Sequence, residues 1–254
     1  LNLGVLYNFG MGVPQDFERA AHWFALAAEQ GQLMAQISLA ALYVSGQGVQ
    51  TNYTEAAKYY AMAAEQGDVG AQLSLAEMYL SGQGVDQDYE QAARYYRLAA
   101  EKGEVAAQFS MALMYRDGLG VEQDYEEAAN YYRMAADQGH IAAMFSMAAM
   151  YETGAGIEQD FEEAFRWYRL AAAQGHPSSQ NNLGLMYESG QGVAENPLRA
   201  YAWLKIASTL ATGEERARFQ SNRNQVETQL SAAQLTEANA LSDRCLESRY
   251  RECE

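Results

Sequence analysis

The fold is decided by residues 71–103, which read AQLSLAEMYLSGQGVDQDYEQAARYYRLAAEKG. In this stretch Leu75, Met78 and Tyr79 are spaced i, i+3 and i+4, which is the apolar stripe of an amphipathic helix. Gly82 follows the stripe, and glycine can end a helix in the left-handed conformation without the steric cost that other residues meet. The stretch therefore predicts a first helix that ends just before this glycine.

A second helix is predicted after the short loop. Asp88 suits its N-cap, because a carboxylate can accept hydrogen bonds from the free amides of a starting helix. Gln91, three residues later, completes the pattern of a capping box. Ala92, Tyr96 and Ala99 then follow at i, i+4 and i+7, the spacing of one buried helix face. Residues 71–103 are thus predicted to form a helix pair.

The same helix pair recurs at a period of 36 residues. Single glycines keep this step at Gly31, Gly67, Gly103, Gly139 and Gly175. Glycine pairs keep it at Gly10/Gly12, Gly46/Gly48, Gly82/Gly84, Gly118/Gly120, Gly154/Gly156 and Gly190/Gly192. Alanine recurs at Ala20, Ala56, Ala92, Ala128, Ala164 and Ala200, and again at Ala27, Ala63, Ala99, Ala135, Ala171 and Ala207. Such periodicity predicts an all-α fold, an α-α superhelix built as a right-handed solenoid of antiparallel helix pairs.

The two ends differ from the middle. Residues 1–212 hold six units, and the first is truncated because Leu1 aligns with Ile37. This open edge, with Leu3 and Leu6, predicts self-association through the N-terminal unit. Residues 213–254 lack the period and are expected to form a C-terminal helical cap. Two helices are predicted there, over 214–230 and from 232 to about 247, the second with a capping box of Ser231 and Gln234.

The pattern A-x-x-x-L-A-x-x-Y-x-x-G-x-G-V-x-x-D-Y-x-x-A-x-x-Y-Y-x-x-A-A-x-x-G resembles the Sel1-like repeat, a relative of the tetratricopeptide repeat. The resemblance covers roughly Leu1 to Ala211. It implies a bacterial protein that acts as a scaffold or adaptor and binds a protein or peptide. It also implies export, so a periplasmic or secreted location is expected, with a cytoplasmic location as the alternative.

Composition excludes several kinds of partner. The net charge is −16 and the isoelectric point is near 4.6, so the chain repels phosphate, and nucleic-acid binding is not expected. Anionic membrane surfaces are disfavoured for the same reason. No apolar run is long enough to cross a bilayer, so membrane insertion is not expected. Basic or neutral partners remain open.

The sequence offers little for catalysis, and the chain is predicted not to be an enzyme. The glycine pairs follow helices and have no lysine after them, so they are interpreted as helix caps and not as phosphate cradles. His140 and His176 occupy equivalent positions of adjacent units, in the same column as Asp68 and Glu104, and His22 lies apart. We interpret this column as the first turn of helices, so no metal and no cofactor are predicted.

Cys245 and Cys253 are the only cysteines, and both lie in the last ten residues. Eight residues along one helix span about 12 Å, which is too far for a disulfide. A bond between them requires the helix to end and the chain to fold back, and free thiols remain the alternative. The repeats lack the cysteines of the cysteine-rich branch of the family, for which a penicillin-related activity has been proposed.

The resemblance also implies a concave groove lined by the first helices. By position, its candidates are Ile37, Ala41, Val44, Leu73, Glu77, Leu80, Phe109, Leu113, Arg116, Phe145, Ala149, Glu152, Asn181, Leu185 and Glu188. These columns vary between units while the alanine columns do not. The first half is mainly apolar and the second half mainly polar and acidic, which predicts a ligand with apolar anchors at one end and basic groups at the other. The alternatives are that the apolar members pack between helices, and that the protein is a cell-wall-related small-ligand (penicillin-like) binder or enzyme. A third reading is a structural element of a larger complex.

Overall fold

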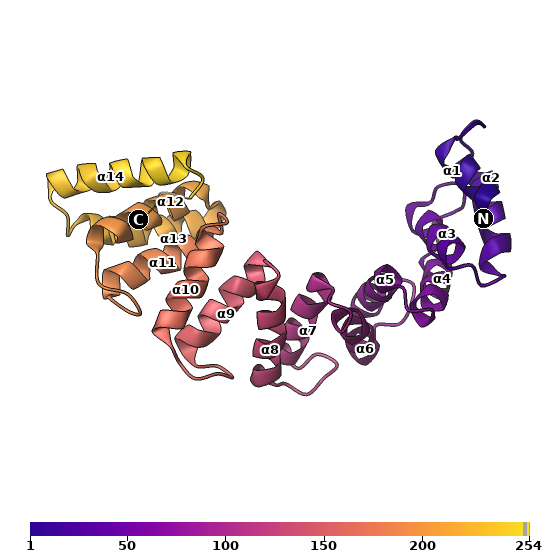
Figure 1. The fold of residues 1–254 in the computed structure, drawn as a ribbon, viewed down its shortest axis with the longest axis horizontal. Helices are drawn as coiled ribbons and strands as arrows, with labels where there is room; N and C mark the ends of the chain where they lie inside the picture. Colours follow the sequence, from indigo (N-terminus) through magenta and orange to yellow (C-terminus); the bar gives the residue numbers. More distant parts are fainter. Residues whose placement is uncertain (251–252, 254) are drawn as a thin grey trace. The chain divides into compact units, whose positions relative to one another are not determined.

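The computed structural model describes residues 1–250 and residue 253, which contain fourteen α-helices and no strand (Figure 1). The helices are α1 (Asn2–Phe9), α2 (Phe17–Ala28), α3 (Leu33–Ser45), α4 (Tyr53–Glu65), α5 (Val69–Ser81), α6 (Tyr89–Ala100), α7 (Val105–Asp117), α8 (Tyr125–Asp137), α9 (Ile141–Thr153), α10 (Phe161–Ala172), α11 (Pro177–Ser189), α12 (Pro197–Leu210), α13 (Gly213–Glu227) and α14 (Ala232–Glu247). The all-α repeat prediction is confirmed. The chain divides into two compact units, residues 1–124 and 125–254, and each is treated by itself below.

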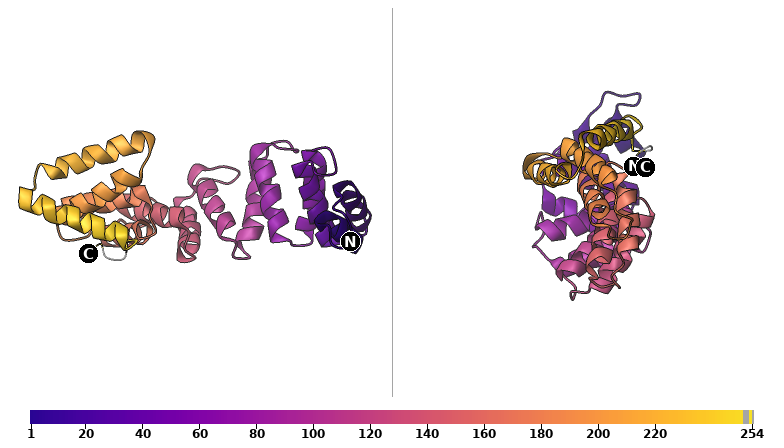
Figure 2. Two further views of the ribbon diagram at one scale, coloured as in Figure 1. Left: turned by 90° about the horizontal axis from the view of Figure 1, so that it is seen from above. Right: turned by 90° about the vertical axis from the view of Figure 1, so that its left-hand side faces the viewer.

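Within each unit, the two helices of a pair pack side by side, as in α5/α6 of the first unit and α9/α10 of the second (Figures 1 and 2). The members of both alanine columns are between 0% and 4% exposed. A methyl group at each crossing lets the helix axes approach closely, and close packing leaves no room for a larger side chain. The alanine period therefore marks the contacts that hold neighbouring helices together.

The helix ends lie where the sequence predicts them, but one predicted capping interaction is absent. Gly82 ends α5 at φ 73°, and Asp88 begins α6 by accepting a hydrogen bond from the Gln91 amide at 3.0 Å. The capping box predicted at Asp88 and Gln91 is wrong, because the Asp88 amide donates instead to the carbonyl of Tyr79 at 3.0 Å. The box predicted at the start of α14 is confirmed.

In every glycine pair after the first, the second glycine also contacts the preceding repeat. Gly84 has φ 80°, and a Cβ atom placed on it would lie 2.4 Å from the carbonyl carbon and oxygen of Tyr53, in the first turn of α4. The same close approach occurs at Gly48, Gly120, Gly156 and Gly192. These loops therefore rest directly on the backbone of the preceding repeat, and only glycine fits there.

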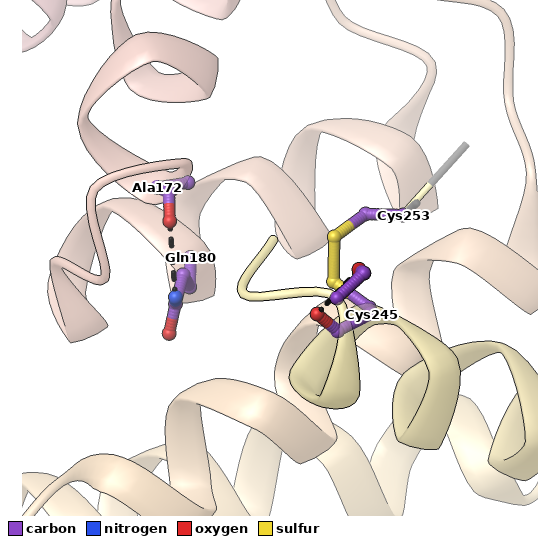
Figure 3. Close-up of a disulfide and its surroundings, with 5 residues drawn as sticks. Ala172, Gln180, Cys245 and Cys253 are labelled. Atoms are coloured by element: carbon purple, nitrogen blue, oxygen red, sulfur yellow. Dashed lines mark hydrogen bonds between the residues drawn. A yellow bond between two sulfur atoms is a disulfide. The ribbon is translucent and has the colours of Figure 1, made fainter. Parts of the chain in front are cut away.

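A column of glutamines, which the sequence analysis did not single out, ties successive repeats together. Buried Gln72 donates from Nε2 to the carbonyl of Ala64 at 3.3 Å, near the end of α4. Equivalent bonds join Gln36 to Ala28, Gln108 to Ala100 and Gln180 to Ala172, the last visible in Figure 3. Because terminal carbonyls of a helix lack intrahelical donors, each glutamine satisfies a group that burial would otherwise penalise.

The C-terminal segment closes the second unit. Both α13 and α14 pack against α12, and a disulfide joins Cys245 at the end of α14 to Cys253, with a Cα–Cα distance of 4.5 Å (Figure 3). The chain folds back through Arg249 and Tyr250, whose φ angles are 52° and 65°. Both sulfur-bearing residues are buried in the same core cluster as Trp203, so the bond lies inside the packing of the cap.

His140 and His176 are N-caps. Their Nδ1 atoms each accept a hydrogen bond of 3.2 Å, from the amides of Ala143 and Ser179 respectively. An accepting Nδ1 carries no proton, so both caps need the neutral imidazole. Burial lowers the pKa of both histidines, and at His176 the nearby Glu215 opposes this effect. His22 is exposed and caps no helix.

The lowered pKa values of His140 and His176 predict that the second unit becomes less stable in acid. Because the folded histidines bind a proton less readily than unfolded ones, the free energy of unfolding falls as the pH drops below their ordinary pKa of 6.5. Thermal unfolding followed by circular dichroism from pH 8 to pH 5 measures this. The variant H140D/H176D, which copies the cap that Asp68 provides to α5, is expected to lose less stability over this range, whereas H22Q behaves like the wild type. Equal pH dependence in all three proteins would contradict the assignment.

The close approach at Gly84 predicts that alanine destabilises the protein more at Gly84 than at Gly12, the equivalent position of the first repeat. Gly12 and Gly84 both have positive φ, but a Cβ atom on Gly12 meets nothing within 4 Å. Gly12→Ala should cost about 1–2 kcal/mol for the left-handed backbone alone. Gly84→Ala should cost a further 1–3 kcal/mol or so, because the loop must move away from α4. Urea unfolding of the two variants measures the difference, and equal losses would show that the close approach is unimportant.

Candidate functional site

The predicted groove residues of the first unit lie on one side of the first helices. Ala41, Val44, Glu77 and Arg116 are exposed, whereas the other members are half-buried, namely Ile37, Leu73, Leu80, Phe109 and Leu113. The half-buried members pack partly between helices. We call the surface formed by α1, α3 and α5 on this side the groove face, and define it by Val5, Asn8, Ala41, Val44, Glu77 and Leu80.

The groove face contains a hollow of about 420 Å³ between α3, α4 and α5. It is lined by three of the predicted residues, Val44, Glu77 and Leu80, together with Tyr53, Tyr60, Ser74, Met78, Ser81 and Gln83. Burial raises the pKa of the Tyr60 hydroxyl, a hydrogen bond with Ser74 opposes this, and Glu77 adds to it. Tyr60 therefore keeps its proton at neutral pH and offers a hydroxyl group at this hollow.

A second hollow, of about 560 Å³, lies between α1, α2 and α3 and was missed by the sequence analysis. It is lined by Leu1, Asn2, Val5, Leu6, Asn8, Phe9, Phe24, Met34 and Ser38. Buried Phe24 lies at its base, while Phe9 and Met34 are 64% and 59% exposed. The 36-residue period could have predicted this second hollow from the first. Three of its lining residues lie one repeat before Val44, Tyr60 and Ser74 of the first hollow, namely Asn8, Phe24 and Ser38.

Charge on the groove face is concentrated in one residue. Within their bounds, α1, α3 and α5 carry a single ionisable acidic or basic side chain, Glu77. Its carboxylate lies near the hydroxyls of Tyr60 and Tyr96, whose pKa values it helps to raise. Among the described residues Glu77 forms no ion pair. The groove face, formed by α1, α3 and α5, is therefore mainly apolar with one unpaired negative charge, whereas the next first helix, α7, carries the ion pair of Arg116 and Asp117.

The predicted groove residues of the second unit contact their own chain. The ring of Phe145 lies 5.7 Å from that of Tyr168, and Glu152 accepts a hydrogen bond of 2.6 Å from the Tyr168 hydroxyl. Burial, and then this carboxylate, raise the pKa of Tyr168. Ala149 and Leu185 are half-buried, and Leu185 packs against the core of this unit.

Two further predicted residues lie against α13. Asn181 is 4% exposed and accepts a hydrogen bond of 2.9 Å from Asn222, and Glu188 accepts bonds from Gln225 and Gln229. The expectation that Asn181 lies on an open surface is therefore wrong, whereas Glu188 is half-buried. The physical reason is that α13 packs on α12 as each earlier first helix packs on the second helix before it, and so covers α11.

The second unit has a hollow of about 760 Å³ beside α8, α9 and α10, and charged side chains such as Arg133, Glu163 and Arg166 line it. No group of three or more histidine, cysteine or acidic side chains in the described part of the chain is placed to hold a metal ion. No helix in that part is both long enough and apolar enough to cross a bilayer. At the N-terminal edge, Leu3 is 45% exposed and Leu6 lines the larger hollow, and self-association there stays a prediction.

Comparison with known proteins agrees with the repeat geometry. The family model of the Sel1 repeat matches six times, at residues 1–32, 33–68, 69–104, 105–140, 141–176 and 177–211. A Sel1 repeat protein from Oxalobacter formigenes is 34% identical, with 83% of this chain and 86% of that chain covered and a TM-score of 0.69. A protective antigen of uropathogenic Escherichia coli with an SLR fold is 27% identical, with 99% and 76% covered and a TM-score of 0.47. No curated protein sequence matches. The chain belongs to the Sel1 repeat family.

Proposed function

We propose that this protein is a non-enzymatic scaffold that binds a segment of another protein on the groove face of its first unit. Sel1 repeat proteins are generally protein-interaction scaffolds. The observation that carries the proposal for this chain is a pair of hollows, one between α1, α2 and α3 and one between α3, α4 and α5, that share equivalent lining positions of successive repeats. Apolar side chains such as Val44, Phe9 and Met34 remain exposed there, although burial would stabilise them.

The lining of the hollows favours a protein segment over a small polar ligand. Small-molecule sites usually enclose their ligand and aim several polar groups at it. Both hollows are open to solvent, and the larger one is lined mainly by aliphatic and aromatic side chains. Such a surface gains free energy by contact with apolar anchors of a partner, and a few anchors supply most of the affinity of an interface.

Val44 provides the test of this proposal, because it is 38% exposed and lines the 420 Å³ hollow. Val44→Asp should leave the helicity unchanged and lower partner binding at least about tenfold, since it places a charge in the apolar contact. Leu73 is a poorer probe because it is half-buried between helices. The matched control is Leu170→Asp, which introduces the same charge at a 48% exposed position of a second helix.

The measurement is affinity capture from an extract of the source organism, quantified by mass spectrometry, with circular dichroism on each purified variant. Proteins that the wild type and Leu170→Asp capture, but Val44→Asp does not, are the groove-face partners. An identical set of captured proteins for all three would show that the binding surface lies elsewhere.

A further inference from the structure

We infer that the segment bound by the groove face is an amphipathic helix with two apolar anchors about two turns apart and one basic side chain beside the second anchor. The inference rests on the proposed function of this face and specifies the chemistry of its partner. It follows from three observations on the first unit: the repetition of the hollows, the kind of side chains that line them, and the position of Glu77.

The hollows repeat with the helices, so a partner that fills both needs two anchors at the repeat spacing. Phe24 and Tyr60 lie at equivalent positions of the two hollows, as do Ser38 and Ser74. The first helices α1 and α3 both pack on α2, and α3 and α5 both pack on α4; because packed helices have axes roughly 8–10 Å apart, we take the repeat spacing as about 10 Å. A helical partner rises about 1.5 Å per residue, so anchors seven residues apart are separated by about 10.5 Å and match this spacing.

The lining of the larger hollow favours a helix over an extended peptide. Leu1, Val5, Leu6, Phe9, Phe24 and Met34 form most of it. An extended peptide would bring unpaired amide and carbonyl groups against these side chains, and each such group costs free energy when it loses water. A helix satisfies its backbone internally and presents only side chains. The few polar groups, such as the Asn8 carbonyl that already accepts from Gln15, do not form a row that could pair with an extended backbone.

Glu77 specifies the basic side chain. It lines the smaller hollow and is the only acidic or basic residue within α1, α3 and α5. A lysine or arginine one turn beyond the second anchor would reach this carboxylate and form a charge-assisted hydrogen bond. The net charge of −16 adds a general attraction for basic segments. The expected pattern is therefore apolar at i and i+7, with a basic residue near i+11.

The test uses three fluorescein-labelled synthetic peptides, of which the two helical ones have equal composition, and the full-length protein, with affinity measured by fluorescence anisotropy. The first peptide is helical with leucines at i and i+7 and lysine at i+11. The second is helical with the same residues scrambled around the helix. The third is kept extended by prolines and carries its leucines at i and i+3, which spans about 10 Å in an extended chain.

The first peptide should bind at least about tenfold more tightly than the other two. Met34→Asp and Val44→Asp, one in each hollow, should each weaken it about tenfold, and Leu170→Asp should not change it. Glu77→Gln should weaken it by a smaller factor and reduce its dependence on salt. Circular dichroism verifies folding, and Met34→Ser and Val44→Ser replace any aspartate variant that unfolds.

The other outcomes separate this inference from the proposed function. If the extended peptide binds best and Val44→Asp abolishes that binding, the inference that the bound segment is helical is wrong, but the groove face still binds protein segments. If none of the peptides binds better than the scrambled one, the pattern is overturned, and the capture experiment with Val44→Asp decides the proposed function independently. Tight binding of the first peptide that neither hollow variant weakens overturns both.

Discussion

The structure of each unit depends on how closely one repeat can approach the next. In every glycine pair after the first, the second glycine sets this distance, because its missing side chain allows the loop to rest on the carbonyl group at the start of the preceding second helix. At Gly84 the neighbouring atoms would be 2.4 Å from a Cβ atom, well inside contact distance. A larger residue would push the loop away and separate the alanine contacts that lie below it. The spacing of the helices, and with it the size of the hollows on the groove face, follows from this contact.

Buried alanine and glutamine side chains also fix how closely neighbouring repeats pack. Ala56 and Ala92 are fully buried where helices cross, so the packing there tolerates no extra volume. Gln72 then crosses from α5 to the end of α4 and satisfies a carbonyl that the close packing has removed from water. Steric fit and hydrogen bonding thus act at the same boundary between neighbouring repeats. Neither involves the side of the first helices that carries Val44 and Glu77.

The period made most of the fold predictable. Because Gly82, Asp88 and Ala92 act through local geometry, their spacing is enough to place helix ends and the buried face, and α5 ends and α6 begins where the sequence predicts. The close approach of Gly84 was not predictable in this way, because it depends on atoms of another repeat. The hollow at Phe24 was missed because its residues come from three helices.

The error at Asn181 has a different cause. Its repeat position is the same as that of Ile37 and Leu73, and nothing within the repeats shows that α11 would be covered. The sequence after residue 213 has no period, so its register against the repeats is set by packing of Phe219 and Val226. The hydrogen bond from Asn222 follows from that packing. Assigning a residue the same environment as its equivalents in other repeats therefore predicts helix packing correctly. It predicts solvent exposure poorly in the last repeat, where a helix outside the period packs on it.

The two units differ in how the outward-facing side chains of their first helices are satisfied. On α11, polar side chains that face outward are satisfied by α13: Asn222 bonds Asn181, and Gln225 and Gln229 bond Glu188. On α5, Glu77 has no such neighbour, and the apolar side chains around it remain partly in contact with water. The packing constraints of the repeat leave these outward positions free to vary, since they take no part in the glycine, alanine or glutamine contacts. In one unit the variation has produced a surface that the chain covers with its own helix. In the other unit, the apolar side chains of the groove face and the carboxylate of Glu77 remain at least partly exposed to solvent.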